Sequence, residues 1–251
     1  MKILMKVVAA MVSIILILLA WIILVSEDLP EGKTGMEAER LADKMLTAID
    51  HDAWERTGAI QWDFGGRHQH LWDRTRHLAE VRWDDYVVLI DINDRKGLVQ
   101  QGYSGDDKEE IATLCLKAWK YWANDSFWLN PISKIRDGGT TRSIVDYEGE
   151  QGLLITYNQG GVTPGDSYLW LLDEDGLPYK WKMWVSIIPV GGISTSWDKW
   201  IKLPTGAMIS TSHKNLVELK ISDVKGASTL RELKGEDVFV PLEAADNLVS
   251  F

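Results

Sequence analysis

The stretch that most constrains the fold of this chain is residues 162–185, VTPGDSYLWLLDEDGLPYKWKMWV. Two apolar, aromatic runs, 168–172 and 179–185, flank an acidic segment that ends in Gly176. Alternation on both sides of a short turn, with a glycine able to adopt a positive φ, predicts a β-hairpin. Because side chains alternate along a strand, Trp170 and Trp181 fall on apolar faces, the second together with Met183. We therefore expect this hairpin to form a wall of a large apolar interior.

A period of two recurs along much of the remaining chain and predicts further strands. The expected strand segments are 57–64, one within 70–83, 86–92, 140–147, 152–158, 197–201, 207–213 and 216–222. Helical spacing instead predicts an amphipathic helix over 36–50, capped by Thr34, and a second within 103–129, capped by Asp106. The tail 226–251 has no clear pattern. The fold class expected is α+β, mainly β, with about ten antiparallel strands and two helices in one domain.

Composition limits the classes of function. The chain has 13 Trp against 4 Phe, which suits either a core filled with large rings or a ligand cleft lined by them. Its formal net charge of −10 disfavours nucleic acid as a partner. The single cysteine, Cys115, excludes a disulfide within the chain. Cys115 lies in the apolar stripe of the second helix, so we expect a buried small hydrophobe.

Residues 7–25 form a run of nineteen residues without a charge, long enough to cross a hydrocarbon core of about 30 Å. Lys2 and Lys6 precede the run, and Glu27 and Asp28 follow it. The positive-inside bias predicts a single-pass signal-anchor within 1–26 with a cytoplasmic N-terminus. A linker, 27–35, and a domain, 36–251, would then lie on the periplasmic or extracellular side. A cleaved signal peptide is the alternative, and it also predicts an exported domain.

The order of these elements resembles the LolA-like lipoprotein-carrier fold, an incomplete antiparallel β-barrel wrapped around helices. The segment TGAIQWDF (57–64), followed by Trp72 and by 86–92, is similar to the opening strands of such carriers. The segments YWANDSFWLNP (121–131) and KIRDGGTTR (134–142) resemble the helix exit and next strand of uncharacterised exported relatives. The resemblance implies a half-barrel that holds an apolar ligand. An anchored chain departs from the soluble carriers, and this departure disfavours a shuttle between two membranes.

The densest polar cluster is His68, His70, Asp73, Arg74 and His77. His68 and His70 share one face of a strand, as two metal ligands could, whereas Asp73 and His77 would share the other face. No HExxH motif or cysteine pair supplies further donors, so neither a metal site nor a cofactor is predicted. The acids at 173–175 are typical of turn chemistry. No GxSxG elbow or phosphate-binding loop occurs, and the chain is not predicted to be an enzyme.

The predicted function is therefore an exported, membrane-anchored binding protein that holds a lipid or acyl chain in the concave face of a half-barrel. An envelope structural or interaction module with a solid core is the alternative, and a hydrolase that uses strand Asp or His residues ranks third. The side chains expected to line the cavity are Trp62, Phe64, Trp72, Trp119, Trp122, Trp170, Trp181 and Met183.

Overall fold

The structure, a computed structural model, describes residues 5–6, 11, 13–14, 22, 24–159, 164–245 and 248–251. The predicted anchor over 7–25 falls for the most part outside the described residues, as does the start of the hairpin segment at 162–163. Within the described part of the chain, none of the helices combines the length and the hydrophobicity that crossing a bilayer requires.

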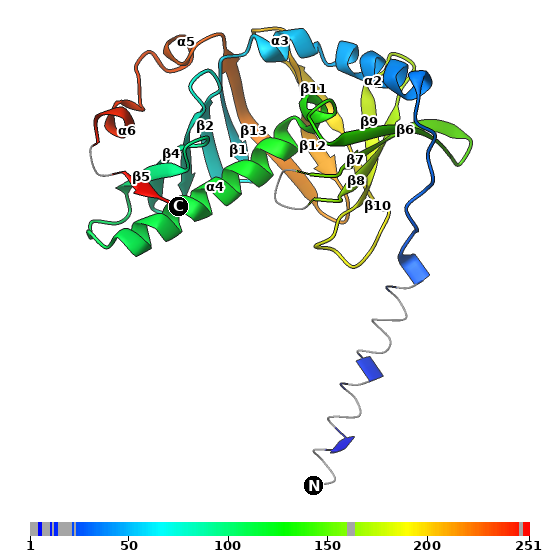
Figure 1. Ribbon diagram of the computed structural model, residues 1–251, viewed down its shortest axis with the longest axis horizontal. Coiled ribbons are helices and arrows are strands. Elements are labelled where there is room, and N and C mark those ends of the chain that lie inside the picture. Colours follow the sequence, from blue (N-terminus) through cyan, green and yellow to red (C-terminus); the bar gives the residue numbers. More distant parts are fainter. Residues whose placement is uncertain are drawn as a thin grey trace.

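The described strands form two antiparallel sheets, and the strand order of neither closes on itself (Figure 1). The nine-stranded sheet has the order β11-β12-β13-β1-β2-β3-β4-β5-β14. Its strands are β1 (Ala59–Phe64), β2 (His68–Asp73), β3 (Leu78–Trp83), β4 (Tyr86–Asp91), β5 (Lys96–Gln101), β11 (Asp198–Lys202), β12 (Met208–Lys214), β13 (Glu218–Ala227) and β14 (Val249–Ser250). The five-stranded sheet has the order β10-β9-β8-β7-β6. Its strands are β6 (Thr140–Tyr147), β7 (Glu150–Tyr157), β8 (Ser167–Leu172), β9 (Pro178–Trp184) and β10 (Ile193–Ser196). The expected mainly-β class is confirmed.

The central hairpin forms as predicted, from β8 and β9. Trp170 lies opposite Trp181 in the register, and Gly176 occupies the turn with φ 91°. The Asp173 carboxylate accepts the backbone N–H groups of Asp175 at 3.0 Å and Leu177 at 2.8 Å. The acids of this segment therefore build the turn, as Asp side chains commonly do.

The face that bears Trp170 and Trp181 packs against solid protein. Both indoles are fully buried, and their ring centroids lie 4.9 Å apart. Trp197 completes a triangle, 5.0 Å from Trp170 and 4.9 Å from Trp181. Because a buried aromatic side chain removes roughly 150–250 Å² from water, this cluster anchors the inner face of the five-stranded sheet.

Five α-helices and one 3₁₀ turn accompany the described strands. They are α2 (Met36–Ala48), α3 (His51–Glu55), α4 (Lys108–Leu129), η1 (Pro131–Lys134), α5 (Leu230–Lys234) and α6 (Val240–Ala244). The predicted helices over 36–50 and within 103–129 correspond to α2 and α4. Both predicted caps are wrong by one residue. Gly35 precedes α2 without a side-chain cap, and Asp107 caps α4 by accepting the Glu109 N–H at 2.9 Å.

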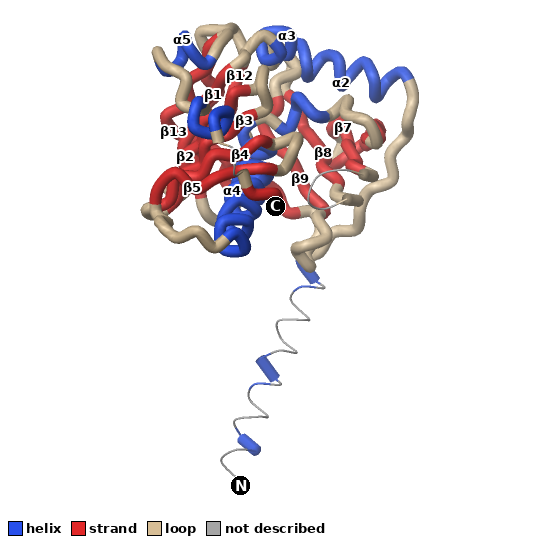
Figure 2. Tube along the Cα trace, turned by 60° about the vertical axis from the view of Figure 1, so that its left-hand side comes forward, coloured by secondary structure: helices blue, strands red, loops and turns tan. Residues whose placement is uncertain are grey.

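Helix α4 joins the two sheets. Figure 2 shows it against the nine-stranded sheet, while α2 lies over the end of the five-stranded sheet. Near its start, Leu114 and Cys115 pack on strands β3 and β4. At its other end, the Trp128 indole lies 4.9 Å from that of Trp181 in β9. Cys115 is fully buried, and burial raises the pKa of its thiol to about 12, which makes it the inert small hydrophobe expected.

The segment 70–83 differs from its prediction, because it contains a turn between β2 and β3. The Asp73 carboxylate accepts the N–H groups of Thr75 and Arg76, both at 3.1 Å, and His77 has φ 59°. Asp73 therefore ends one strand and His77 precedes the next, so the two do not share a strand face. Strands β5, β10 and β14 were also not predicted, and β14 pairs the end of the chain with β5.

The predicted linker 27–35 packs along the five-stranded sheet. Glu27 forms an ion pair with Lys182, and its carbonyl accepts the indole N–H of Trp184 at 2.8 Å. Lys33 forms a β-bridge with Ile144 in β6. These contacts tie residues 27–35 to both β9 and the edge strand β6.

Candidate functional site

A cavity of about 590 Å³ opens where the two sheets approach each other. The nine-stranded sheet contributes the ends of β1 and β12 and the turn between β12 and β13, whereas the five-stranded sheet contributes β9 and β10. Trp128, near the end of α4, forms part of the wall. We call this cavity the intersheet cleft. Its lining residues are Phe64, Gly65, Arg67, Trp128, Met183, Thr195, His213, Asn215, Leu216, Val217, Glu218 and Leu219.

The lining of the intersheet cleft is mainly apolar. Phe64 and Met183 are almost completely buried, so they form fixed parts of the wall. At the rim, Leu216 and Val217 are 96% and 80% exposed. These two residues lie in the turn after β12, which brings apolar surface to the mouth of the cleft instead of the usual polar turn residues. A cleft of this size and lining is typical of small-molecule sites.

Two buried polar side chains in the wall have unused hydrogen-bonding capacity. Among the described residues, the hydroxyl of Thr195 has no hydrogen-bond partner. The ring nitrogens of His213 have none of normal geometry, and the backbone of Ser196 is the polar group next to the ring. Both residues are at least 98% buried. Leaving such a group buried and unpaired costs about 1–3 kcal/mol.

The His213 ring is held by aromatic neighbours. Its centroid lies 4.1 Å from that of Trp197 and 5.7 Å from that of Trp128. Burial lowers the pKa of His213 to about 4. The imidazole is therefore neutral near pH 7, with one nitrogen able to donate a hydrogen bond and the other able to accept one.

The eight side chains expected to line a cavity are distributed over several environments. Phe64 and Met183 line the intersheet cleft, and Trp72 lines a second, smaller pocket. Trp170 and Trp181 belong to the solid core of the five-stranded sheet. Trp62 is buried between β1 and α4, and Trp119 and Trp122 are half-buried on α4 against the nine-stranded sheet.

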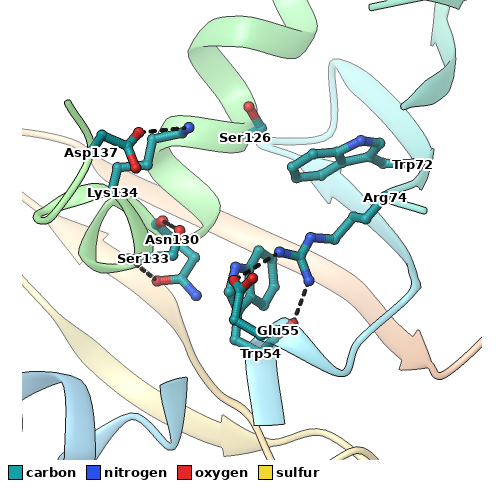
Figure 3. Close-up of a pocket in the computed structure, with 9 residues that line it drawn as sticks. All are labelled: Trp54, Glu55, Trp72, Arg74, Ser126, Asn130, Ser133, Lys134 and Asp137. Atoms are coloured by element: carbon teal, nitrogen blue, oxygen red, sulfur yellow. Dashed lines mark hydrogen bonds and ion pairs between the residues drawn. The ribbon is translucent and has the colours of Figure 1, made fainter. Parts of the chain in front are cut away.

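The second pocket, about 140 Å³, lies between α3 and the end of α4 and is polar (Figure 3). The Arg74 guanidinium lies 4.2 Å from the ring centroid of Trp54 and 5.4 Å from that of Trp72. It donates to the carbonyl oxygens of Trp54 and Thr57 and pairs with Glu55 at 3.3 Å. Arg74 is thus engaged in joining α3 to β2, and it leaves little of its charge for a ligand.

The histidine pair singled out from the sequence meets a carboxylate from another element. His68 and His70 lie on the same face of β2, as expected, and both contact Asp125 of α4. His68 Nδ1 and His70 Nε2 each lie 2.7 Å from the same oxygen, Asp125 Oδ2. Burial lowers the pKa of His70, and its bond to Asp125 opposes that effect.

Three site residues were missed from the sequence: Thr195, His213 and Asp125. Asp125 had a detectable signal, because it continues the buried stripe of α4 through Ala118 and Leu129, where a charged residue is unusual. His213 and Thr195 had no comparable signal, since each lies in an ordinary alternating strand.

Comparison with known proteins adds a distant structural likeness. No protein-family model matches the sequence, and no curated protein matches it. Among solved structures, the chain is similar to a DUF1329 family protein from Desulfovibrio piger ATCC 29098, known from a crystal structure at 1.75 Å resolution. That likeness has a TM-score of 0.37 and 11% sequence identity, and it covers 79% of this chain and 97% of the other. The resemblance to lipoprotein carriers stays a prediction.

Proposed function

We propose that this protein binds an amphipathic ligand with an acyl chain in the intersheet cleft, as a half-barrel of the LolA-like kind would. The observation that carries the proposal is the pairing of a largely apolar cavity of about 590 Å³ with two buried polar side chains, Thr195 and His213, in its wall. Among the described residues, neither has a hydrogen-bond partner of normal geometry, and the backbone of Ser196 is the polar group next to the His213 ring. An apolar wall suits a hydrocarbon chain, and the two polar groups suit a single head group that hydrogen-bonds.

The chemistry of the wall favours an uncharged acyl group over a free carboxylate. A neutral His213 ring and the Thr195 hydroxyl can each donate to a carbonyl oxygen. The net charge of −10 disfavours an anion at long range, and within the cleft Arg67 and Glu218 bring one charge of each sign. Burying ten methylene groups contributes about 8 kcal/mol, from which the entropic cost of association is subtracted.

The test is a titration of the full chain, held in a mild detergent, with a dansyl-labelled acyl ester whose emission follows energy transfer from tryptophan. Met183→Trp fills the cleft and is expected to weaken binding at least about tenfold. Ile187→Trp adds the same side chain at a position that is 75% exposed and outside the cleft, so it is the matched control. Binding that is absent, or that is equal in wild type and both variants, refutes the proposal.

A second function, an interaction module of the cell envelope, is favoured by the solid packing around Trp170 and Trp181. In that case the tryptophans only fill the core, and the emission of the acyl probe does not reach a plateau in the titration. The anchor over 7–25 and an exported location belong to both proposals. The location is tested with Leu216→Cys, which places a thiol at an exposed position. A reagent that does not cross membranes should label this thiol in intact cells if the domain is exported.

A further inference from the structure

A second cluster of chemically active side chains lies outside the intersheet cleft, between β2 and α4. His68 Nδ1, His70 Nε2 and an oxygen of Asp125 all lie within 4.8 Å of one another. The side chains of His70 and Asp125 are at least 99% buried, whereas that of His68 is 16% exposed. The two imidazoles therefore meet at Asp125 Oδ2, and His68 is the most exposed of the three side chains.

The surroundings hold each donor in place. The Asn124 amide donates to the second oxygen of Asp125 at 2.8 Å, which fixes the carboxylate plane. Tyr121 stacks on the His68 ring at 3.8 Å, and Trp62 stacks on the His70 ring at 4.5 Å. Support of this kind around the ligands is what metal sites need to fix the geometry of their donors.

The electrostatics of the cluster favour a cation. Among the described ion pairs, Asp125 has no Lys or Arg partner, and its two partners are the imidazoles. A carboxylate is costly to bury without a compensating charge. A divalent ion bound through the three lone pairs supplies that charge. His70 Nδ1 lacks a described partner with or without an ion, so it does not bear on this choice.

We propose that His68, His70 and Asp125 form a binding site for a divalent transition-metal ion of the Zn²⁺ type. Two imidazole nitrogens and one carboxylate oxygen are a donor set that such ions accept, with the remaining coordination position open toward solvent. Metal–ligand bonds of 2.0–2.2 Å require the donors to lie roughly 3–3.5 Å apart. The two 2.7 Å contacts to Asp125 therefore need to lengthen by a few tenths of an ångström. The three donors, which lie within 4.8 Å of one another, need to take up that spacing around the ion. The site fastens β2 to α4 and is independent of acyl binding.

The test uses the full chain in detergent, stripped of metal with EDTA and titrated with Co²⁺ alone. Wild type is expected to develop visible absorption bands that saturate at one equivalent, and Zn²⁺ is expected to displace them and to raise the Tm. Asp125→Asn and His68→Gln are each expected to weaken Co²⁺ binding more than about 100-fold. His77→Asn is the matched control, because it removes an exposed histidine at φ 59°, which Asn tolerates, and it should bind as wild type does.

Circular dichroism without metal shows whether each variant folds. His68→Gln is the safer of the two, since His68 is less buried than Asp125. If both variants fail to fold, the wild-type titration decides alone. The absence of a saturable Co²⁺ spectrum at one equivalent overturns the proposal. A spectrum that persists in a folded His68→Gln or Asp125→Asn variant also overturns it, because the ion then binds elsewhere.

Discussion

His213 gives the sharpest quantitative prediction, because its burial is tied to the shape of the intersheet cleft. The residue is 99% buried, and burial lowers the pKa of its imidazole to about 4. The charged groups near it are Asp198, which pairs with Ser212 of β12, and Arg67 and Glu218, which line the same cleft. In the unfolded chain the ring titrates near its ordinary value of about 6.5.

The direction in which stability changes with pH follows from where the folded and unfolded states take up a proton. Above pH 6.5 the ring is neutral in both states, and it has no effect on the pH dependence of stability. Between pH 6.5 and 4 the unfolded state takes up a proton that the folded state does not, so acid destabilises the fold. At pH 5 the loss from this one group is about 2 kcal/mol relative to pH 8, and it approaches about 3 kcal/mol below pH 4.

Urea unfolding of the full chain at pH 8 and pH 5 measures this loss, with His213→Gln and His213→Phe compared against wild type. Both variants remove the titrating group, one with a polar side chain and one with an apolar ring. From pH 8 to pH 5, the free energy of unfolding of the wild type should fall by about 2 kcal/mol more than that of either variant. The contributions of the other titrating groups cancel in this comparison. An equal loss in all three proteins would show that His213 is not shielded from water in the cleft.

Two further substitutions test the packing. Trp181→Ala should cost about 3–5 kcal/mol in the free energy of unfolding, because it empties the centre of the aromatic cluster, and a loss below about 1 kcal/mol in urea would contradict the solid core. Gly97→Ala should cost about 1–3 kcal/mol, since a Cβ there would lie 2.7 Å from the Leu89 carbonyl oxygen and 2.9 Å from Cys115 Sγ. Gly138→Ala, with nothing within 4 Å of the added atom, is the matched control and should change the unfolding midpoint little; equal effects at the two positions would argue against close contact of α4 with β5.

The contrast between Asp73 and Asp125 shows how far a linear pattern extends. Asp73 lies on a strand as predicted, as the last residue of β2, and its carboxylate also closes the following turn. That turn is a local bond of the kind that Asp in the segment DRTR indicates, and it separates Asp73 from the strand face of His77. Asp125 is 55 residues from His70, and its contact depends on where α4 crosses the nine-stranded sheet. Periodicity fixes which face of a helix is buried, but it carries no information on the angle at which that helix crosses a sheet.

The sequence by itself determined the mainly-β class, the hairpin with its acidic turn, the two main helices and the shared face of His68 and His70. Each of these depends on side-chain period or on contacts within a few residues. Only the tertiary structure decided that Trp170 and Trp181 face solid core while Met183, two residues beyond Trp181, faces a cleft. An apolar strand face is packed or left open according to which side chains of the other sheet lie opposite it. Those contacts join residues far apart in the sequence, and a local pattern carries no information on them.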